Sequence, residues 1–413
     1  MLSAEIIAIG SELLTPTKTD TNSLWLTEKL NDIGIEVMLK TIVGDDGTRL
    51  EETVRDAMRR SEIVITTGGL GPTEDDITRV CTAAAIGRAL TYHDDIEAHL
   101  RERFKAWGRE MPEINKRQAF VIDGAEILPN PHGSAVGMLA DVEGRSLIIL
   151  PGPPRENQPM FNEYVLDRLK KVAGETHVRR RLLRISGLGE SAVDEIAAPI
   201  YTSYPSVQTS ILFNKSEVEL HVAARADASD DAQKTADEVA EKLIAALGKA
   251  VFSTNGETME EIVGALLTAR GETLAVAESC TGGLIGQRIT SVAGSSAYFM
   301  EGAVTYSNQA KIRTLKVPAE IIEQHGAVSA ECAEAMASGM REYARTDHAI
   351  SITGIAGPDG GSDEKPVGTV YIGYAGRDIT KSVHLVLPGD RYLIRWRSSQ
   401  AALDYLRRQL IKG

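Results

Sequence analysis

The sequence predicts an α/β protein in which two three-layer α/β/α domains are joined by a small α+β domain. Its 413 residues suggest two or three domains, at roughly 150 residues each. Apolar segments alternate with segments of helical spacing in residues 1–172 and again in 254–413, which is typical of mostly parallel, doubly wound sheets. Residues 173–253 differ, because their strands alternate apolar and polar residues as antiparallel strands do.

The composition is that of a folded, acidic protein. Hydrophobic residues make up 43% of the chain and charged residues 25%, which excludes a disordered or fibrous protein. The net charge of −13 disfavours nucleic acid and anionic membranes as partners, although a pocket of backbone N–H groups can still bind a small phosphorylated ligand. Three cysteines, the lack of a leader pattern in the first residues and the lack of an apolar run of about 18 residues predict a cytoplasmic protein with no membrane partner.

The elements expected in residues 1–172 follow from their apolar spacing. Leu24, Leu26, Leu30 and Ile33 have helical spacing, and Asp20 or Thr21 is a suitable N-cap for that helix. In chain order, the expected strands are 5–9, 36–43, 63–67, 125–128 and 146–150, and the expected helices are 21–33, 50–60 and 156–171.

The remaining elements follow from the same patterns. In 173–253 the expected strands are 178–185, 207–212, 218–224 and 250–252, with helices 190–200 and 230–248. In 254–413 the expected strands are 274–277, 349–353 and 369–374, with helices 254–271, 281–289 and 391–411. The basic run 179–181 is interpreted as an edge-strand guard or an ion-paired face rather than a nucleic-acid patch.

The segment 66–78 joins a buried strand to a helix and is rich in glycine. In an open α/β sheet, ligands bind at the carboxyl ends of the strands. Gly68, Gly69 and Gly71 would let backbone N–H groups approach a phosphate closely, and Thr73 adds a hydroxyl.

Acidic residues converge on the same sheet edge. Asp75 and Asp76 would repel a bare phosphate, and Asp45 ends a neighbouring strand, so we expect a divalent metal between these acids and the phosphate. The alternative is structural: the glycines form a tight turn, and Asp75 or Asp76 caps a helix.

Five sequence runs carry a specific resemblance at this point. They are IGSELL, DTNS, TGGLGPTEDDIT, NKRQAF and LPGPPRE. They resemble the molybdopterin-binding-like amino-terminal domain of the CinA (competence/damage-inducible protein) family. The resemblance implies an ADP-ribose pyrophosphatase that needs a divalent metal, Mg²⁺ or a transition metal, and forms AMP and ribose 5-phosphate.

The resemblance also implies which residues line that pocket. At matching positions these are Asp45, Gly68, Gly69, Thr73 and Asp76. The chain departs from the family pattern at 133–137, where a Thr-Ala-Pro run is expected after the first glycine, but Ser134 keeps a hydroxyl and is a candidate for substrate binding.

A second candidate site begins at Ser279, which follows the strand 274–277. Thr281, Gly282 and Gly283 come next, at an expected strand-to-helix junction where free N–H groups and the positive helix end stabilise an anion. A serine nucleophile needs a base, and a buried lysine of lowered pKa can be one. The residues alone therefore predict an anion site with a possible serine hydrolase.

Other segments supply partners for this serine. Tyr306 and Lys311 follow one connection, and Thr353 ends a strand that leads to Gly360 and Gly361. Arg391, Arg395 and Arg397 begin the terminal helix, and of these Arg395 is the candidate for substrate binding.

Two structural alternatives compete with a serine nucleophile. Ser279 is also a good helix N-cap, and Cys280 is a rival nucleophile. A catalytic cysteine usually has a histidine partner, and no histidine here sits in a recognisable motif, so Cys280 is interpreted as a small buried side chain.

The second region also resembles the CinA family, in its carboxy-terminal domain. The matching runs are AESCTGG, VTYSN followed by Lys311, GAVSAE, TGIAGPDGG and KPVGTVY. That domain is similar to nicotinamide mononucleotide (NMN) deamidases. The resemblance implies Ser279 as nucleophile, with Tyr306, Lys311 and Thr353 around it and no cofactor; Lys316 stands where the family pattern has Gly.

Together the two resemblances imply a homodimeric hydrolase of pyridine-nucleotide salvage, with NMN and ADP-ribose as its small-molecule partners. Two alternatives remain open at this point. The amino-terminal domain could be a non-catalytic nucleotide- or pterin-binding regulatory module, or the protein could be a competence or DNA-repair factor.

Overall fold

The first sheet of the protein combines parallel and antiparallel strands. The computed structural model describes residues 2–174 and 177–411. The chain divides into two compact units. The first comprises Met1–Arg179 and Arg225–Gln233, and the second comprises Arg180–Ala224 and Lys234–Gly413. The sheet has the order β2-β1-β3-β8-β7-β6; the first four strands are parallel, and β7 and β6 are antiparallel. The strands are β1 (Ser3–Ile9), β2 (Glu36–Val43), β3 (Ile63–Thr67), β6 (Glu126–Leu128), β7 (Gly137–Val142) and β8 (Arg145–Leu150).

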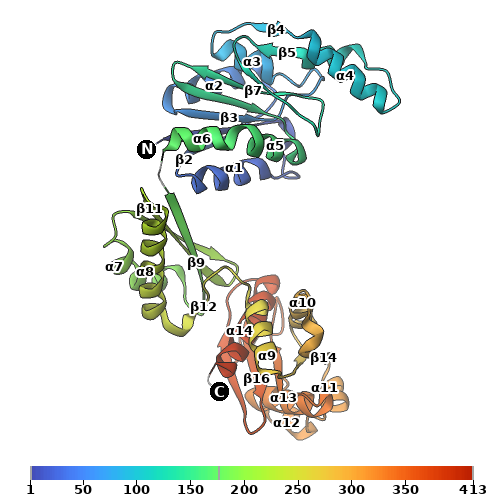
Figure 1. The fold of residues 1–413 in the computed structure, drawn as a ribbon. Helices are drawn as coiled ribbons and strands as arrows, with labels where there is room; N and C mark the ends of the chain where they lie inside the picture. The colour runs from blue at the N-terminus through green and yellow to red at the C-terminus, as the bar shows by residue number, and fades with distance from the viewer. Residues whose placement is uncertain (1, 175–176, 412–413) are drawn as a thin grey trace. The chain divides into compact units, whose positions relative to one another are not determined.

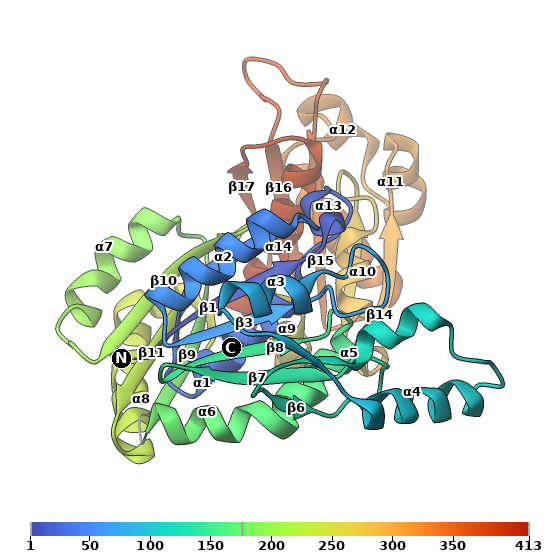
Figure 2. The same ribbon diagram turned by 90° about the horizontal axis from the view of Figure 1, so that it is seen from above.

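Helices cover both faces of this sheet (Figures 1 and 2). We call the sheet and its helices the amino-terminal domain. One face packs against α1 (Thr21–Asp32), α5 (Pro154–Met160) and α6 (Leu166–Ala173), and the other against α2 (Gly47–Arg60) and α3 (Thr78–Ala85). Neighbouring strand residues enter opposite cores: Ile6 faces the first and Ile7 the second, as the two-residue period of a strand requires. The three-layer α/β/α architecture is confirmed here.

Several elements of this domain differ from the expectations. A two-stranded ladder of β4 (Leu90–Tyr92) and β5 (Phe120–Ile122), the helix α4 (Asp94–Ala106) and the strand β7 were not expected. The helix expected after the 66–78 segment is present as α3. The expected helix 156–171 is three pieces, because a π-helical turn at Phe161–Val165 separates α5 from α6. The expected N-cap is present, since the Asp20 side chain accepts a hydrogen bond from Ser23 N.

A four-stranded sheet with the order β10-β11-β9-β12 follows. Its strands are β9 (His177–Ser186), β10 (Val207–Asn214), β11 (Glu217–Ala226) and β12 (Val251–Ser253), and its helices are α7 (Glu190–Tyr201) and α8 (Ser229–Leu247). β9 lies between β11 and β12, so it is not an outer strand as expected, but Arg181 forms an ion pair with Asp237, which fits an ion-paired face. We call this region the small domain.

The third sheet, with the order β14-β13-β15-β16-β17, defines the carboxy-terminal domain. β14 (Phe299–Val304), β13 (Leu274–Glu278) and β15 (His348–Gly354) are parallel, and β16 (Thr369–Ala375) and β17 (Thr380–Val386) are antiparallel. One core includes α9 (Met259–Arg270), α10 (Leu284–Thr290) and α14 (Arg391–Leu410), and the other includes α13 (Ala330–Ala344). The remaining helices are α11 (Asn308–Leu315) and α12 (Ala319–His325).

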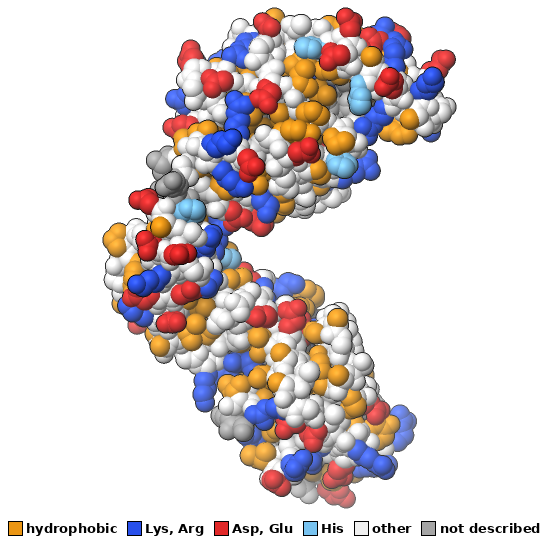
Figure 3. Space-filling model, in the orientation of Figure 1, with side chains coloured by type: hydrophobic (Ala, Val, Ile, Leu, Met, Phe, Trp, Pro, Cys, Tyr) orange, Lys and Arg blue, Asp and Glu red, His pale blue; other side chains and the backbone are white. Residues whose placement is uncertain are grey.

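No helix within 2–174 or 177–411 is long and apolar enough to span a membrane. On the face shown in Figure 3, basic and acidic side chains are interspersed.

Candidate functional site

Ser279 lies immediately after the carboxyl end of β13, between the ends of β14 and β15. Its N–H extends the parallel ladder by donating to Ile352 O at 3.0 Å. The residue is 8% exposed and lines a pocket of about 210 Å³. The backbone of the serine is therefore fixed by the sheet, while its hydroxyl remains open to a ligand.

The Lys311 amine reaches this serine from α11. Its Nζ lies 3.0 Å from Ser279 Oγ and donates to the carbonyl oxygens of Thr305 at 2.9 Å and Tyr306 at 3.4 Å. Since carbonyls only accept hydrogen bonds, a neutral amine would direct its two hydrogens to them and its lone pair to the serine hydroxyl. The distance to the hydroxyl is within the range that a general base requires.

Burial of the amine favours that neutral form. Lys311 is 1% exposed, and its hydrogen-bond partners in the described chain are a hydroxyl and two carbonyls, with no carboxylate among them. Burial lowers the pKa of Lys311 from its usual value of 10.5, against a weaker opposing effect of the Cys332 and Cys280 thiols.

Cys280 lines the same pocket, but its thiol is held in the protonated form. Burial raises the pKa of Cys280 to about 11. Because the thiolate is the reactive form of cysteine, this side chain is a poor nucleophile near neutral pH.

Glu278, which the sequence prediction missed, organises the turn that carries the serine. Its carboxylate is 2% exposed and accepts hydrogen bonds from the N–H groups of Gly283, Ile285 and Gly286 at 2.9, 3.2 and 2.9 Å. α10 begins only at Leu284, not at 281 as expected, so Ser279 lies in a turn and the helix N-terminus is capped by the protein's own carboxylate. The expected stabilisation of a substrate anion by that helix end is therefore wrong.

The pocket brings together all four residues predicted as catalytic. Ser279, Tyr306, Lys311 and Thr353 line it. The Thr353 hydroxyl donates to Ala327 O at 2.7 Å.

The residues predicted to bind substrate in this region are placed differently. Asn308 and Arg391 line the pocket, whereas the predicted Thr281, Gly282, Gly283, Gly360, Gly361 and Arg395 do not. The Arg395 guanidinium is instead bound to Thr281 O, at 2.6 and 3.2 Å. Arg391, one turn earlier on α14, donates to Tyr306 Oη at 3.1 Å and Gly357 O at 2.7 Å. The signal for Arg391 was its place in the same basic run.

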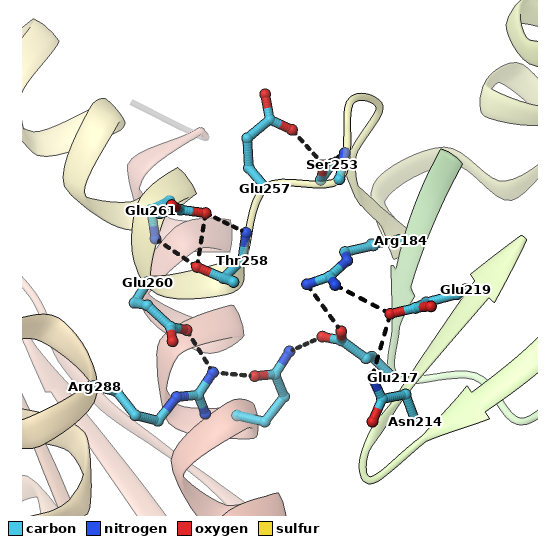
Figure 4. A network of polar contacts seen from close by, with 12 residues as sticks. Arg184, Asn214, Glu217, Glu219, Ser253, Glu257, Thr258, Glu260, Glu261 and Arg288 are labelled. Atoms are coloured by element: carbon cyan, nitrogen blue, oxygen red, sulfur yellow. Dashed lines mark hydrogen bonds and ion pairs between the residues drawn. The ribbon is translucent and has the colours of Figure 1, made fainter. Parts of the chain in front are cut away.

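A buried polar network joins the small domain to α10 and α14 (Figure 4). Arg288 of α10 is 4% exposed and forms an ion pair with Glu260 of α9 at 2.7 Å. It also contacts Gln400 of α14, whose Nε2 donates to Glu217 Oε2 at 3.1 Å, and Glu217 pairs with Arg184 at 3.2 Å. α14 therefore contacts the serine pocket through Arg391 and the small domain through Gln400.

A larger pocket, of about 720 Å³, opens at the carboxyl ends of β1, β3 and β8. Its lining includes seven predicted residues: Gly68, Gly69, Gly71, Ser134, Asp45, Asp75 and Asp76. Gly68 has φ +108°, and a Cβ there would lie 2.2 Å from Ile9 O, so only glycine fits this close approach.

Asp76 holds the glycine loop together. Its Oδ1 accepts from Gly71 N at 2.8 Å, and its Oδ2 accepts from Thr73 N at 2.9 Å and Thr73 Oγ1 at 2.6 Å. Thr73, a predicted substrate-binding residue, does not line the pocket, because its hydroxyl points to this carboxylate.

The other two aspartates are the better candidates for metal ligands. Asp45 Oδ2 accepts a hydrogen bond from Ser11 N at 2.9 Å, and the Asp75 carboxylate has no hydrogen-bond partner among the described residues. Within 2–174 and 177–411, no three His, Cys, Asp or Glu side chains are grouped to hold a metal ion. The two carboxylates of Asp45 and Asp75 fit Mg²⁺, which usually takes one or two carboxylates and completes its coordination shell with water and substrate phosphate oxygens.

Glu156, Asn22 and Lys18 also line this pocket and were not predicted. Glu156 ends the run LPGPPRE, which follows β8, and Asn22 lies in DTNS, where α1 begins. The position of these two runs at the same edge of the sheet could have identified both residues from the sequence.

Known protein families and relatives match this chain over nearly its whole length. Family models match for the probable molybdopterin binding domain (residues 5–171), the damage-inducible protein CinA KH domain (180–253) and the CinA C-terminal domain (256–410). A CinA-like protein of Koribacter versatilis is 50% identical over 412 residues, 99% of this chain and 100% of the relative. A putative competence-damage inducible protein of Caldicellulosiruptor saccharolyticus is 41% identical over 410 residues, again 99% and 100%.

A solved structure of competence/damage-inducible protein CihA from Agrobacterium tumefaciens is 39% identical and covers 37% of this chain and 93% of its own, with a TM-score of 0.35. The full-length relatives and the three consecutive family matches lead to one conclusion: the chain belongs to the CinA family.

Proposed function

We propose that the carboxy-terminal pocket hydrolyses the carboxamide of NMN to give nicotinic acid mononucleotide and ammonia. The observation that carries this proposal is the 3.0 Å contact between Lys311 Nζ and Ser279 Oγ, at an amine whose pKa is lowered by burial. The likeness of the carboxy-terminal domain to NMN deamidases supplies the substrate.

Each residue has a defined part in the proposed reaction. Neutral Lys311 takes the proton of the Ser279 hydroxyl as Oγ bonds to the carboxamide carbon. The carbon–nitrogen bond then breaks, and the lysine ammonium returns the proton to the leaving nitrogen, which departs as ammonia. Lys311 then takes a proton from water as the water oxygen bonds to the ester carbon, and it returns that proton to Ser279 Oγ as the ester bond breaks, which frees the acid and restores the serine and the neutral lysine.

Arg391 is the basic residue placed to recognise the phosphate of the substrate. It lines the pocket, and its guanidinium is oriented by Gly357 O and Tyr306 Oη. A planar guanidinium suits a phosphate, because it offers paired donors.

Product analysis tests this proposal. The full chain is incubated in EDTA with NMN or with nicotinamide riboside, and ammonia and products are identified by enzymatic assay and mass spectrometry. We expect NMN to be deamidated and the riboside, which lacks the phosphate, to react at least about 10-fold more slowly. An inert protein, or equal rates, would contradict the proposal.

We infer a second activity for the amino-terminal pocket, the cleavage of ADP-ribose to AMP and ribose 5-phosphate. A specific observation favours it: the glycine loop, Asp45 and Asp75 line one pocket of about 720 Å³ at the sheet edge. A divalent metal held there would neutralise the diphosphate charge. Gly68 and Gly69 would leave room for the diphosphate beside the backbone, while Asp76 keeps the loop in shape.

The test is turnover of ADP-ribose by the full chain with Mg²⁺, Mn²⁺ or Co²⁺. Formation of AMP and ribose 5-phosphate in equal amounts is expected. Binding of ADP-ribose without turnover under any metal would instead favour a non-catalytic regulatory module.

A further inference from the structure

Glu156 is a buried carboxylate that faces a ligand pocket without a cation beside it. It lies on the first turn of α5, is 8% exposed and lines the amino-terminal pocket. No ion pair joins it to any residue that the structure describes. Glu12, on the same pocket, differs because it is exposed and pairs with Lys18 at 3.1 Å.

One oxygen of Glu156 is held firmly by its surroundings. Oε2 accepts a hydrogen bond from Asn130 Nδ2 at 2.8 Å. Asn130 is itself fixed, because the same amide group donates to Ala135 O at 2.8 Å and accepts from His132 N at 3.1 Å. Gly133 packs so closely that a Cβ on it would lie 1.7 Å from Oε2. The carboxylate therefore has one fixed orientation.

The second oxygen has no partner within the chain. Oε1 accepts no hydrogen bond from any described residue, although a carboxylate can accept several. Oε1 is not among the buried side-chain atoms that lack a partner, so solvent reaches it from the pocket, and a ligand hydroxyl can take the place of that water. The pocket therefore offers a fixed acceptor to a hydrogen-bond donor of the ligand.

Two observations indicate which group of the ligand donates the hydrogen bond to Glu156. Glu156 belongs to no group of three potential metal ligands among the described residues, so a metal centre shared with two of the aspartates is disfavoured. In open α/β sheets that bind nucleotides, a carboxylate at the strand ends characteristically accepts a hydrogen bond from a ribose hydroxyl. ADP-ribose carries such hydroxyls on both of its riboses.

We propose that Glu156 is a specificity-determining residue whose Oε1 accepts a hydrogen bond from a ribose hydroxyl of ADP-ribose. This assignment rests on the proposed pyrophosphatase function of the amino-terminal pocket. It explains why the run LPGPPRE ends in an acid although the ligand is anionic: the acid faces hydroxyls, while Gly68–Gly71 face the diphosphate.

The experiment measures ADP-ribose binding to the full chain by calorimetry in EDTA, where no turnover is expected. Glu156→Gln replaces the acceptor by an amide of the same shape, and Glu163→Gln, an exposed residue of the same helical run, is the matched control. We expect E156Q to weaken binding about 10- to 100-fold and E163Q to leave it unchanged. Thermal unfolding shows whether E156Q is folded. Glu156→Asp keeps the charge and tests the carboxylate if E156Q is not folded, and we expect it to bind ADP-ribose more tightly than E156Q.

Deoxy analogues identify the hydroxyl. Two analogues of ADP-ribose are used, each lacking the 2′-hydroxyl of one ribose. One of them should bind the wild type as weakly as ADP-ribose binds E156Q, and E156Q should bind that analogue no more weakly than it binds ADP-ribose. With metal added, the metal concentration for half-maximal turnover should be the same in E156Q and wild type. A raised metal requirement, or equal losses for every analogue, would overturn the assignment.

The outcomes separate this assignment from the function beneath it. If the wild type binds no ADP-ribose, the pyrophosphatase proposal fails and the assignment fails with it. If the wild type binds ADP-ribose and E156Q binds it equally well, only the role of Glu156 is wrong.

Discussion

At the residue scale, the serine pocket is defined by how burial changes two neighbouring side chains. Lys311 and Cys280 are both buried, and in each case burial favours the uncharged form. For the lysine this creates a base, and for the cysteine it removes a nucleophile. Ser279 and Lys311, both predicted from the sequence, line the pocket. The sequence also favoured serine over Cys280, which it interpreted as a small buried side chain without a histidine partner, but it could not show that burial raises the pKa of this thiol to about 11.

Substitution of the two candidate nucleophiles separates their roles. We expect Ser279→Ala to lower kcat for NMN deamidation at least about 1,000-fold, because no other activated nucleophile lines the pocket. Cys280→Ala should remain within about 10-fold of wild type, since it loses only a small buried side chain. Ammonia release is the measurement, and an active S279A with an inactive C280A would show that the cysteine is the nucleophile.

The charge state of Lys311 predicts the pH dependence of deamidation. The active form is the neutral amine, so kcat/KM should rise with pH and level off at a pKa below the usual 10.5. Lys311→Arg keeps the charge but removes the base, and should lose about 100-fold or more in kcat. Lys316→Arg, on the exposed end of the same helix, is the control. An active K311R with an unchanged pH profile would limit Lys311 to a structural role.

At the element scale, turns and caps decide where the sites form, and here prediction from sequence was least complete. The strands 36–43 and 63–67 were predicted to the residue. The second is buried throughout, whereas the first is an edge strand that is mostly half-buried or exposed. β7 was missed, since it starts at a glycine and carries Asp141 near its end; it lies in the sheet between β6 and β8. The start of α10 was missed because it depends on where the Glu278 carboxylate points.

Glu278 offers a direct test of that turn. Glu278→Gln keeps the shape of the side chain but removes the charge that three backbone N–H groups share, so we expect a loss of about 1–3 kcal/mol in the free energy of unfolding and a lower deamidation rate. Glu320→Gln, at the exposed first turn of α12, should cost a few tenths of a kcal/mol. Denaturant unfolding of both variants checks this, and equal stability would show that the cap contributes little.

At the scale of the whole molecule, the two candidate sites lie in pockets on two separate sheets, with different chemistry in each. The amino-terminal pocket has aspartates and a glycine loop, while the serine pocket has a buried lysine and, among the described residues, no carboxylate in its lining. The repeated βα pattern predicted several strands of both sheets, but β7 in the first sheet and β14 and β17 in the other were not predicted. The network from Glu217 to Arg288 was not predictable, because its members are far apart in sequence and meet only through folding.

Chelation should separate the two proposed activities. EDTA is expected to stop ADP-ribose cleavage and to leave NMN deamidation within about twofold, since only the first needs a metal. Asp75→Asn should lower ADP-ribose cleavage at least about 10-fold without disturbing the loop, whereas Asp76→Asn would also break the hydrogen bonds that hold it. Asp56→Asn, on the exposed face of α2, is the control. Deamidation lost on chelation would place the metal in the serine pocket.

Attack of Ser279 on the carboxamide, with Lys311 as base, leaves an ester on the serine that can be trapped. The full chain is mixed with NMN in EDTA, quenched with acid within one turnover and analysed by intact-mass and peptide mass spectrometry. We expect an added mass equal to NMN minus ammonia, located on Ser279 and absent in S279A. Rapid deamidation with an adduct on Cys280, or turnover that persists in S279A, would contradict it.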